Sequence, residues 1–343
     1  MRKKIILTTI ILVVVLAGFA AWKFYGPAVS TSGGEFFYIK TGSEYTDVKQ
    51  ALLSKKYINS GIWFDWASKL LRYKTVRPGR YKLKKGLSIF SLVRMFRSGN
   101  QAQVNLVITK LRTKEDLARK AGTLFECDSI QLIGFLNNVD SISKYGLDTN
   151  GLMAVVMPFT YTLNWNSGPG RIFQNFFTAY NNFWTPERKL KADSLHLNPI
   201  QISTLASIVE EETLKKEDKY NIASVYMNRI AAGMPLQADP TVKFALKDFG
   251  LKRVLAVHLK TVSPYNTYLH TGLPPGPICT PSIETIDAVL DAPRTSYLYF
   301  VASSNFDGSS IFTSNLADHM KYARKYQKAL TRLLDSLKKV KPE

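Results

Sequence analysis

The most continuous hydrophobic pattern in the chain lies at its start. An apolar run without any charge extends from Ile5 to Trp22 and follows the basic residues at 2–4. A helix of 18 residues is about 27 Å long, close to the hydrocarbon thickness of a bilayer. Basic residues beside a membrane span stay in the cytoplasm. The pattern predicts a cytoplasmic tail over 1–4, a transmembrane anchor over 5–22 and an exported body. A cleaved signal peptide is the alternative, because small residues near position 20 could serve as a cleavage site.

The next part of the chain has short, mixed patterns. A small, polar segment over 23–35 is expected to be a linker. Between 36 and 106 we expect three helices and a strand, at 47–53, 63–71 and 88–96 for the helices and at 79–83 for the strand. Ser88 is expected near the N-cap of its helix. These elements predict a small α+β module.

The rest of the chain, over 107–343, is richer in helical patterns. Its middle part carries closely spaced aromatic residues that we interpret as core, at Phe173, Phe176, Phe177, Tyr180, Phe183 and Trp184. The most regular patterns fall within 200–320. We expect helices at 202–213 and 220–232, one beginning at Asp239, and a long basic one over 315–339, with a strand hairpin at 297–302 and 310–313. The fold class is therefore α+β, with a transmembrane helix, a small α+β module and a larger helix-rich α+β domain.

Charge and composition narrow the classes of partner. The net charge is +20, and the stretch 55–97 contains twelve Lys or Arg residues against the single acid Asp65. Such a stretch can bind nucleic acid, anionic lipid or an acidic polymer, or be a solvated surface near an anionic membrane. Export and the absence of any nucleic-acid-binding motif exclude nucleic acid.

Metal and disulfide chemistry have little support in the sequence. The two cysteines, Cys127 and Cys279, match no metal-ligand spacing, and whether they pair is left open. The four histidines form no H-E-x-x-H pattern. We therefore do not expect a zinc enzyme.

Three adjacent glutamates close the helix at 202–213. With Leu205 as reference and an advance of about 100° per residue, Glu212 falls at about 340°, within the apolar stripe of the helix. Glu210 and Glu211 fall at about 140° and 240°, away from that stripe or beside it. Apolar surroundings raise the pKa of a carboxyl group, as a general acid requires. Glu212 is thus the candidate acid, although a run of glutamates is more often a solvated helix end.

Two polar stretches follow the glutamates. Gln237, Asp239 and Thr241 stand at a loop-to-helix junction, where Asp239 fits a helix cap better than a catalytic group. The stretch 263–277 combines tyrosines, amides and hydroxyls with proline and glycine. Such groups suit a saccharide groove, but a plain structured loop has a similar composition.

Taken together, these stretches resemble the endolytic murein transglycosylase family (MltG or YceG-like). The resemblance is carried by ASIVEEET at 206–213, by the span 221–246, by YNTYLHTGLPPGPICTPS at 265–282 and by the span 297–319. The segment PGRYKLKKGLSIFSLVRMFRSG at 78–99 looks like the family's LysM-like module, which would cover 36–106. The middle region, about 125–190, matches only loosely.

The resemblance implies a function and a set of site residues. Glu212 matches the catalytic glutamate of the E-x-E-T motif, whose middle position, here Glu211, is more often a lysine in the family. It implies cleavage of the β-1,4 bond between N-acetylmuramic acid and N-acetylglucosamine in nascent peptidoglycan, with 1,6-anhydro ends as products. It also implies a reaction without a metal or organic cofactor and a place in the bacterial inner membrane beside peptidoglycan synthases. The residues expected to bind substrate are Glu210, Gln237, Asp239, Thr241, Tyr265, Asn266, Thr267, Tyr268 and Asn315.

Two other classes of function remain open. A noncatalytic wall-binding protein would keep the anchor and the basic module without needing Glu212. A lysozyme-type hydrolase needs two carboxylates that flank the bond, and Asp239 is the candidate for the second. The mass of the products distinguishes the three classes.

Overall fold

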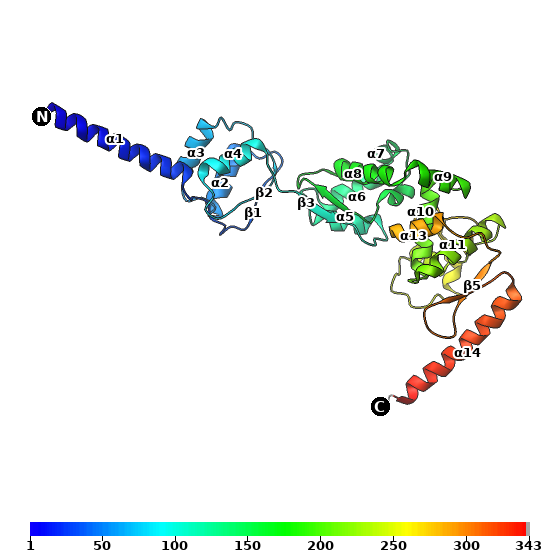
Figure 1. The fold of residues 1–343 in the computed structure, drawn as a ribbon. Coiled ribbons are helices and arrows are strands. Elements are labelled where there is room, and N and C mark those ends of the chain that lie inside the picture. The colour runs from blue at the N-terminus through cyan, green and yellow to red at the C-terminus, as the bar shows by residue number, and fades with distance from the viewer. Residues whose placement is uncertain (341–343) are drawn as a thin grey trace. The chain divides into compact units, whose positions relative to one another are not determined.

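The chain folds into two compact units (Figure 1). The computed structural model describes residues 1–340. The first unit comprises Met1–Leu106, Ala121–Asp128 and Thr162–Gly168, and the second comprises the remaining segments. β3 (Val104–Val107) and β4 (Thr160–Leu163) form a two-stranded sheet. The fold is a mixed, helix-rich α+β structure with an apolar N-terminal helix, as the sequence predicts.

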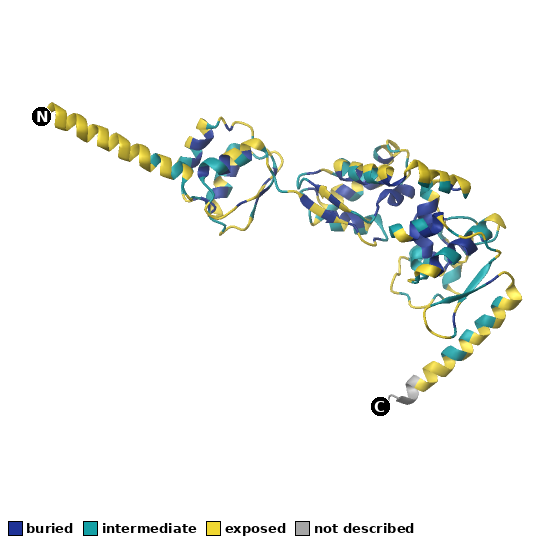
Figure 2. Ribbon diagram, in the orientation of Figure 1, coloured by how far each residue is buried: buried dark blue, intermediate teal, exposed yellow. Residues whose placement is uncertain are grey.

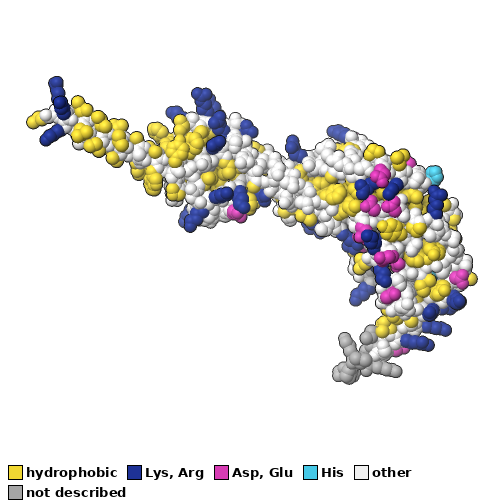
Figure 3. Space-filling view, viewed as in Figure 1, with side chains coloured by type: hydrophobic (Ala, Val, Ile, Leu, Met, Phe, Trp, Pro, Cys, Tyr) yellow, Lys and Arg dark blue, Asp and Glu magenta, His cyan; other side chains and the backbone are white. Residues whose placement is uncertain are grey.

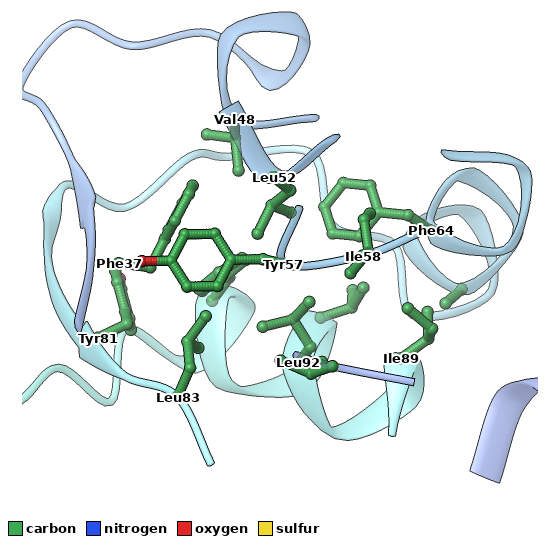
Figure 4. Packing of buried hydrophobic residues seen from close by; sticks show 14 of the residues in the cluster. Phe37, Val48, Leu52, Tyr57, Ile58, Phe64, Tyr81, Leu83, Ile89 and Leu92 are labelled. Carbon is green, nitrogen blue, oxygen red and sulfur yellow. The ribbon is translucent and has the colours of Figure 1, made fainter. Parts of the chain in front are cut away.

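The first unit is built around one small hydrophobic core (Figure 4). Its elements are α1 (Arg2–Tyr25), β1 (Phe36–Ile39), α2 (Tyr45–Ser54), α3 (Gly61–Leu70), β2 (Gly79–Lys82) and α4 (Ile89–Ser98). β1 and β2 pair antiparallel, with Phe37 opposite Tyr81. Ser88 caps α4 by accepting a hydrogen bond from the Ser91 backbone N–H, so that its predicted capping role is confirmed.

The segment after α1 is folded onto this unit, although its composition is typical of a linker. The backbone N–H groups of Ala28 and Val29 donate to the Leu87 carbonyl. The Val29 side chain is 3% exposed and belongs to the core. Backbone hydrogen bonds and one buried apolar side chain hold the segment in place, which composition alone does not reveal.

The second unit is mostly helical. Its elements are α5 (Lys114–Gly122, which ends in the first unit), α6 (Ser129–Asn137), α7 (Val139–Ser143), η1 (Gly151–Val155), α8 (Pro169–Phe183), α9 (Pro186–Ser194), α10 (Pro199–Glu212), α11 (Lys216–Ala231), α12 (Asp239–Leu246), η2 (His258–Lys260), α13 (Ile283–Leu290), β5 (Tyr299–Ala302), β6 (Ser310–Thr313) and α14 (Leu316–Val340). The expected helices and the β5–β6 hairpin are confirmed, with ends that differ by a few residues. Five of the six aromatic residues expected in the core are buried, and Phe177 is half-buried.

α10 is the central helix of the second unit. All residues from Ile202 to Val209 are buried, because α9, α11, α12, α13 and η1 pack around it (Figure 2). Asn198 and Gln201 form a capping box at its start, and Pro199 occupies the first turn. These signals fix the helix at one end and leave its last residue, Glu212, at the other.

Candidate active site

Glu210 holds α10 to its neighbours. Its Oε2 accepts hydrogen bonds from the Ser282 hydroxyl at 2.9 Å and from the Thr285 hydroxyl, both at the start of α13. It also pairs with Lys219 of α11, whose side chain is 8% exposed, at 3.4 Å. All these partners belong to the protein, so Glu210 fastens three helices together. We had expected it to bind substrate, but its carboxyl contacts are structural.

Glu211 points to another side of α10, into a basic pair. Its carboxyl lies 2.9 Å from the Lys110 ammonium and 3.1 Å from the Arg112 guanidinium. Burial by itself would raise the pKa of Glu211, but hydrogen bonds and charge from these two residues lower it. Glu211 is therefore held ionised by two basic partners, although its negative charge still contributes to raising the pKa of Glu212.

The segment that carries Lys110 and Arg112 is bound to the same region by backbone hydrogen bonds. The Leu111 N–H donates to the Thr280 hydroxyl at 2.8 Å, and the Thr280 N–H donates to the Leu111 carbonyl at 2.7 Å. Nearby, the Ile278 N–H donates to the Ser207 hydroxyl of α10 at 3.0 Å. Hydrogen bonds and ion pairs thus connect the C-terminal half of α10 to two loops that are far apart in the sequence.

Glu212 faces a cavity of about 310 Å³. The cavity is lined by Glu212, Arg229, Leu236, Gln237, Asp239, Tyr268, Phe300 and His319. Glu212 remains partly exposed. Among the described residues, Tyr226 of α11 is the hydrogen-bond donor to its carboxyl, from the phenol to Oε1 at 2.7 Å.

The surroundings of Glu212 raise its pKa to about 7. Burial of the carboxyl is the largest cause, and the negative charge of Asp239 adds to it. The hydrogen bond from Tyr226 and the charge of Lys243 act in the opposite direction but do not cancel the effect of burial. A position at the C-terminus of a helix also disfavours a negative charge. Glu212 can therefore hold and release a proton near neutral pH.

Arg229 forms one wall of the cavity and is 8% exposed. Its guanidinium donates to the carbonyls of Leu298 at 2.7 Å and Leu236 at 2.8 Å. It also donates to the Gln237 side-chain carbonyl at 3.4 Å. Gln237 has a φ of 54°, a conformation that is uncommon for residues other than glycine and that clusters at functional sites. Arg229 therefore supports the backbone that presents Gln237 to the cavity.

Asp239 and Tyr268 form a second polar pair in the cavity. The Tyr268 phenol donates to Asp239 Oδ1 at 2.6 Å. We expected Asp239 to cap α12, which is wrong by one residue: Ala238 is the N-cap and makes no side-chain hydrogen bond. Asp239 starts the helix instead, and Pro240 in the first turn fixes the backbone there.

His319 completes the wall from the first turn of α14. Its ring stacks on Tyr299 with centroids 5.3 Å apart, and its buried Nδ1 has no hydrogen-bond partner in the described part of the chain. Burial lowers the pKa of His319, and the charge of Arg229 lowers it further. The imidazole is therefore neutral at pH 7 and offers a hydrogen-bonding atom that the fold does not use.

Other residues expected to bind substrate form a buried polar cluster, which consists of Thr241, Asn266 and Thr267 and is at most 1% exposed. The hydroxyls of Thr241 and Thr267 lie 2.8 Å apart, and the Thr267 hydroxyl accepts from the Ala238 N–H. The Asn266 amide donates to the carbonyls of Leu259 and Thr261 at 2.9 and 2.8 Å. These contacts hold the loop in place and leave no group for a ligand.

Tyr265 and Asn315 also lie outside the cavity lining. The Tyr265 ring packs on Phe244 with centroids 4.6 Å apart. Asn315 caps α14, where its side chain accepts from the Asp318 N–H at 2.9 Å. Of the nine residues expected to bind substrate, Gln237, Asp239 and Tyr268 share the cavity with Glu212.

The sequence reasoning missed Tyr226, Arg229, Leu236, Phe300 and His319. Tyr226 and Arg229 are three residues apart on α11 and thus share a face, a signal that was present in the sequence. His319 comes from more than 100 residues beyond Glu212, and no local pattern connects them. Among residues 1–340, no group of three or more histidine, cysteine or acidic side chains could hold a metal ion. Both cysteines are free and buried.

Comparison with known proteins supplies an independent view. The YceG-like family profile matches residues 37–325. The chain is 30% identical to a Bacillus subtilis protein named endolytic murein transglycosylase, over 84% of this chain and 83% of that protein. It is 26% identical to a Streptococcus pneumoniae protein of the same name, over 82% of this chain and 56% of that longer protein. A crystal structure of a yceG-like protein from Listeria monocytogenes superimposes with a TM-score of 0.56 at 25% identity, covering 83% of this chain and 98% of that one.

Proposed function

The chain belongs to the YceG-like family, and from this premise we propose that it is a peptidoglycan lytic transglycosylase with Glu212 as its catalytic acid. The names of its relatives support the substrate and the class of reaction. One observation carries the role of Glu212: a carboxyl whose pKa is about 7 faces an open cavity. No other glutamate of the triplet has such surroundings, because the carboxyls of Glu210 and Glu211 are held by protein partners.

The proposed reaction needs one proton donor. Glu212 protonates the oxygen of the β-1,4 bond between N-acetylmuramic acid and N-acetylglucosamine as the bond from C1 to that oxygen breaks. The C6 hydroxyl of the muramic residue then attacks C1, and the Glu212 carboxylate accepts the hydroxyl proton. The product carries a 1,6-anhydro end, and Glu212 is protonated again for the next cycle.

The other cavity residues have supporting roles in this proposal. Tyr226 orients the Glu212 carboxyl through its hydrogen bond to Oε1. Gln237, Tyr268 and His319 offer amide, phenol and imidazole groups for sugar hydroxyls and acetamido groups. The buried charge of Arg229 fixes the loop that carries Gln237.

A lysozyme-type hydrolase is the second candidate, because one observation favours it. Asp239 lines the same cavity as Glu212, and its negative charge reaches that carboxyl. Hydrolysis by two carboxylates would use such a pair. The hydrogen bond from Tyr268 to Asp239 gives the aspartate a structural role as well.

Digestion of purified wall sacculi separates the two candidates. Mass spectrometry of the released fragments should show anhydro ends, which are lighter than reducing ends by one water molecule. Reducing ends would establish the hydrolase instead. A complete lack of fragments from the folded parent protein, with binding retained, would identify a noncatalytic wall-binding protein.

The remaining parts of the chain fit an enzyme that works at the membrane. An 18-residue window of α1 has a mean hydropathy of 2.6, and the helix is long and apolar enough to cross a bilayer. We therefore propose a single-pass anchor in the inner membrane with the body outside the cytoplasm. We propose that residues 36–106 act as a LysM-like module that binds glycan. The enzyme would then end nascent strands beside the synthases that build them.

A further inference from the structure

α3 has an apolar face that is largely exposed. Ile62, Trp66 and Leu70 are 65%, 65% and 64% exposed. Their spacing of four residues places them within an arc of about 80° on the helix. The opposite face buries Phe64 and Ala67 in the core of the first unit. An exposed stripe of large apolar residues, including a tryptophan, is typical of an interaction surface.

This stripe continues into a contact with the membrane helix. Trp63 lies about 100° from Ile62 around α3, at nearly the same angular position as Leu70 but about two turns before it. Its ring contacts Phe19 of α1 edge-on, with centroids 6.2 Å apart, and Phe24 at 5.5 Å. Phe19 lies three residues before the end of the apolar run at Trp22, or about 4.5 Å along the helix axis. α3 is therefore attached to α1 at the level where the apolar run ends.

The residues around this junction have the composition of a membrane interface. Trp22, Tyr25 and Phe90 place aromatic rings beside it, with Tyr25 packed on Phe90 at 5.1 Å. Lys23 of α1 and Lys69 of α3 are close to the apolar surface in sequence and add positive charge, which anionic headgroups attract. A cavity of about 140 Å³ opens here, lined on its polar side by Lys23, Asn59 and Ser60. Figure 3 shows hydrophobic side chains along α1 and on the adjoining surface of the first unit.

We propose that the Ile62–Trp66–Leu70 face of α3 lies in the interfacial layer of the bilayer that α1 crosses. The occupant of this face is lipid, because the stripe is continuous with a helix whose own partner is lipid. α3 then makes a second, shallow contact with the membrane. This contact restricts the orientation of the first unit, which α1 alone would leave free to rotate. The inference rests on the proposed anchor but not on the proposed reaction.

Spin labels test the depth of α3 in the full-length protein. Single cysteines replace Ile62, Trp66 or Leu70, and the native Cys127 and Cys279 are buried. Leu12→Cys in α1 is the reference for the bilayer core, and Thr46→Cys, an exposed position on α2, is the matched control. Each protein is reconstituted in vesicles of phosphatidylcholine and phosphatidylglycerol. Accessibility to oxygen, which concentrates in lipid, is then compared with accessibility to a water-soluble nickel chelate.

The ratio of oxygen accessibility to nickel-chelate accessibility should be severalfold higher at positions 62, 66 and 70 than at position 46. It should be lower at these three positions than at position 12. The proposal would be overturned if position 12 lies in lipid but the accessibility ratio at the three α3 positions equals the ratio at position 46. That result would leave the anchor intact. A label at position 12 that favours the nickel chelate would overturn the anchor and this inference together. Neither outcome bears on the reaction, which wall digestion measures separately.

Discussion

The cavity around Glu212 and the buried polar cluster of Thr241, Asn266 and Thr267 both contain polar side chains suited to sugar binding, but they differ in whether those side chains reach open space. The cavity is open, and the Glu212 carboxyl, whose pKa is raised, faces it. The cluster is closed, and its hydroxyl and amide groups bond to protein atoms. Residue type suggests sugar binding in both regions, but only unsatisfied groups that reach a cavity can bind a ligand.

The strongest way to test this difference is to change each glutamate of the triplet to glutamine. Glu212→Gln should lower the release of anhydro fragments from wall glycan by at least about 10²- to 10⁴-fold, because glutamine cannot donate an acidic proton. Glu210→Gln and Glu211→Gln should retain much of the activity, since their contacts are structural. Fragment release is measured for all three, with thermal melting as a control for folding. An active Glu212→Gln beside an inactive, folded Glu210→Gln would move the acid to Glu210.

The buried cluster should show its effect in stability instead of chemistry. Asn266→Ala removes two donated hydrogen bonds and leaves the carbonyls of Leu259 and Thr261 without a partner. A loss of about 1–3 kcal/mol in the free energy of unfolding is expected. Asn305→Ala, at an exposed asparagine in the β5–β6 turn, is the matched control and should change stability little. Denaturant titration measures both, and an unchanged stability of Asn266→Ala would contradict the structural role.

The raised pKa of Glu212 should also appear in the pH dependence of stability. A carboxyl whose pKa rises from its ordinary value of 4.5 in the unfolded chain to about 7 in the folded state stabilises the fold fully below pH 4.5. That stability is lost as the pH rises towards 7, because the unfolded chain then gives up its proton more readily. Glu212→Gln lacks this loss, so above pH 7 it should be more stable than the parent by about 1–3 kcal/mol. Unfolding curves of both proteins at pH 4 and pH 8 give the comparison; an equal difference at the two pH values would argue against a raised pKa.

The smallest effects should come from the neighbours that tune Glu212. Activity of the parent should fall as the pH rises through about 7, where the acid loses its proton. Tyr226→Phe removes a hydrogen bond to the carboxylate and should move this descending limb to higher pH. Asp239→Asn removes a negative charge and should move it to lower pH. Rates of fragment release across pH measure the limb; a shift in the same direction for both variants would show that their electrostatic roles are misassigned.

Much of the fold could be predicted because its signals are local. The uncharged run of α1, the Ser88 cap and the periodicity of α10, α11 and α14 each lie within a few turns of chain. The angular positions of the three glutamates on the helix also separated Glu212 from Glu210 and Glu211. That argument assumed a single apolar stripe, whereas α10 is buried on all sides.

The candidate site was harder to predict because its members meet only in three dimensions. Gln237 and Asp239 stand near a helix start that the sequence marks, and they do reach the cavity. Phe300 and His319 arrive from the hairpin and from α14, and no spacing in the sequence relates them to Glu212. Thr241 and Asn266 were included for their chemistry, and the sequence does not tell that their hydrogen bonds are already satisfied.

The contacts between residues 107–120 and the end of α10 have a mechanical consequence. These residues are the first of the second unit along the chain. Lys110 and Arg112 pair with Glu211, and Leu111 makes two hydrogen bonds with Thr280, one to its hydroxyl and one from its backbone N–H. A displacement of this segment would therefore reach α10 one residue from Glu212. The Glu212 carboxyl is for that reason mechanically coupled to a segment that lies far earlier in the sequence.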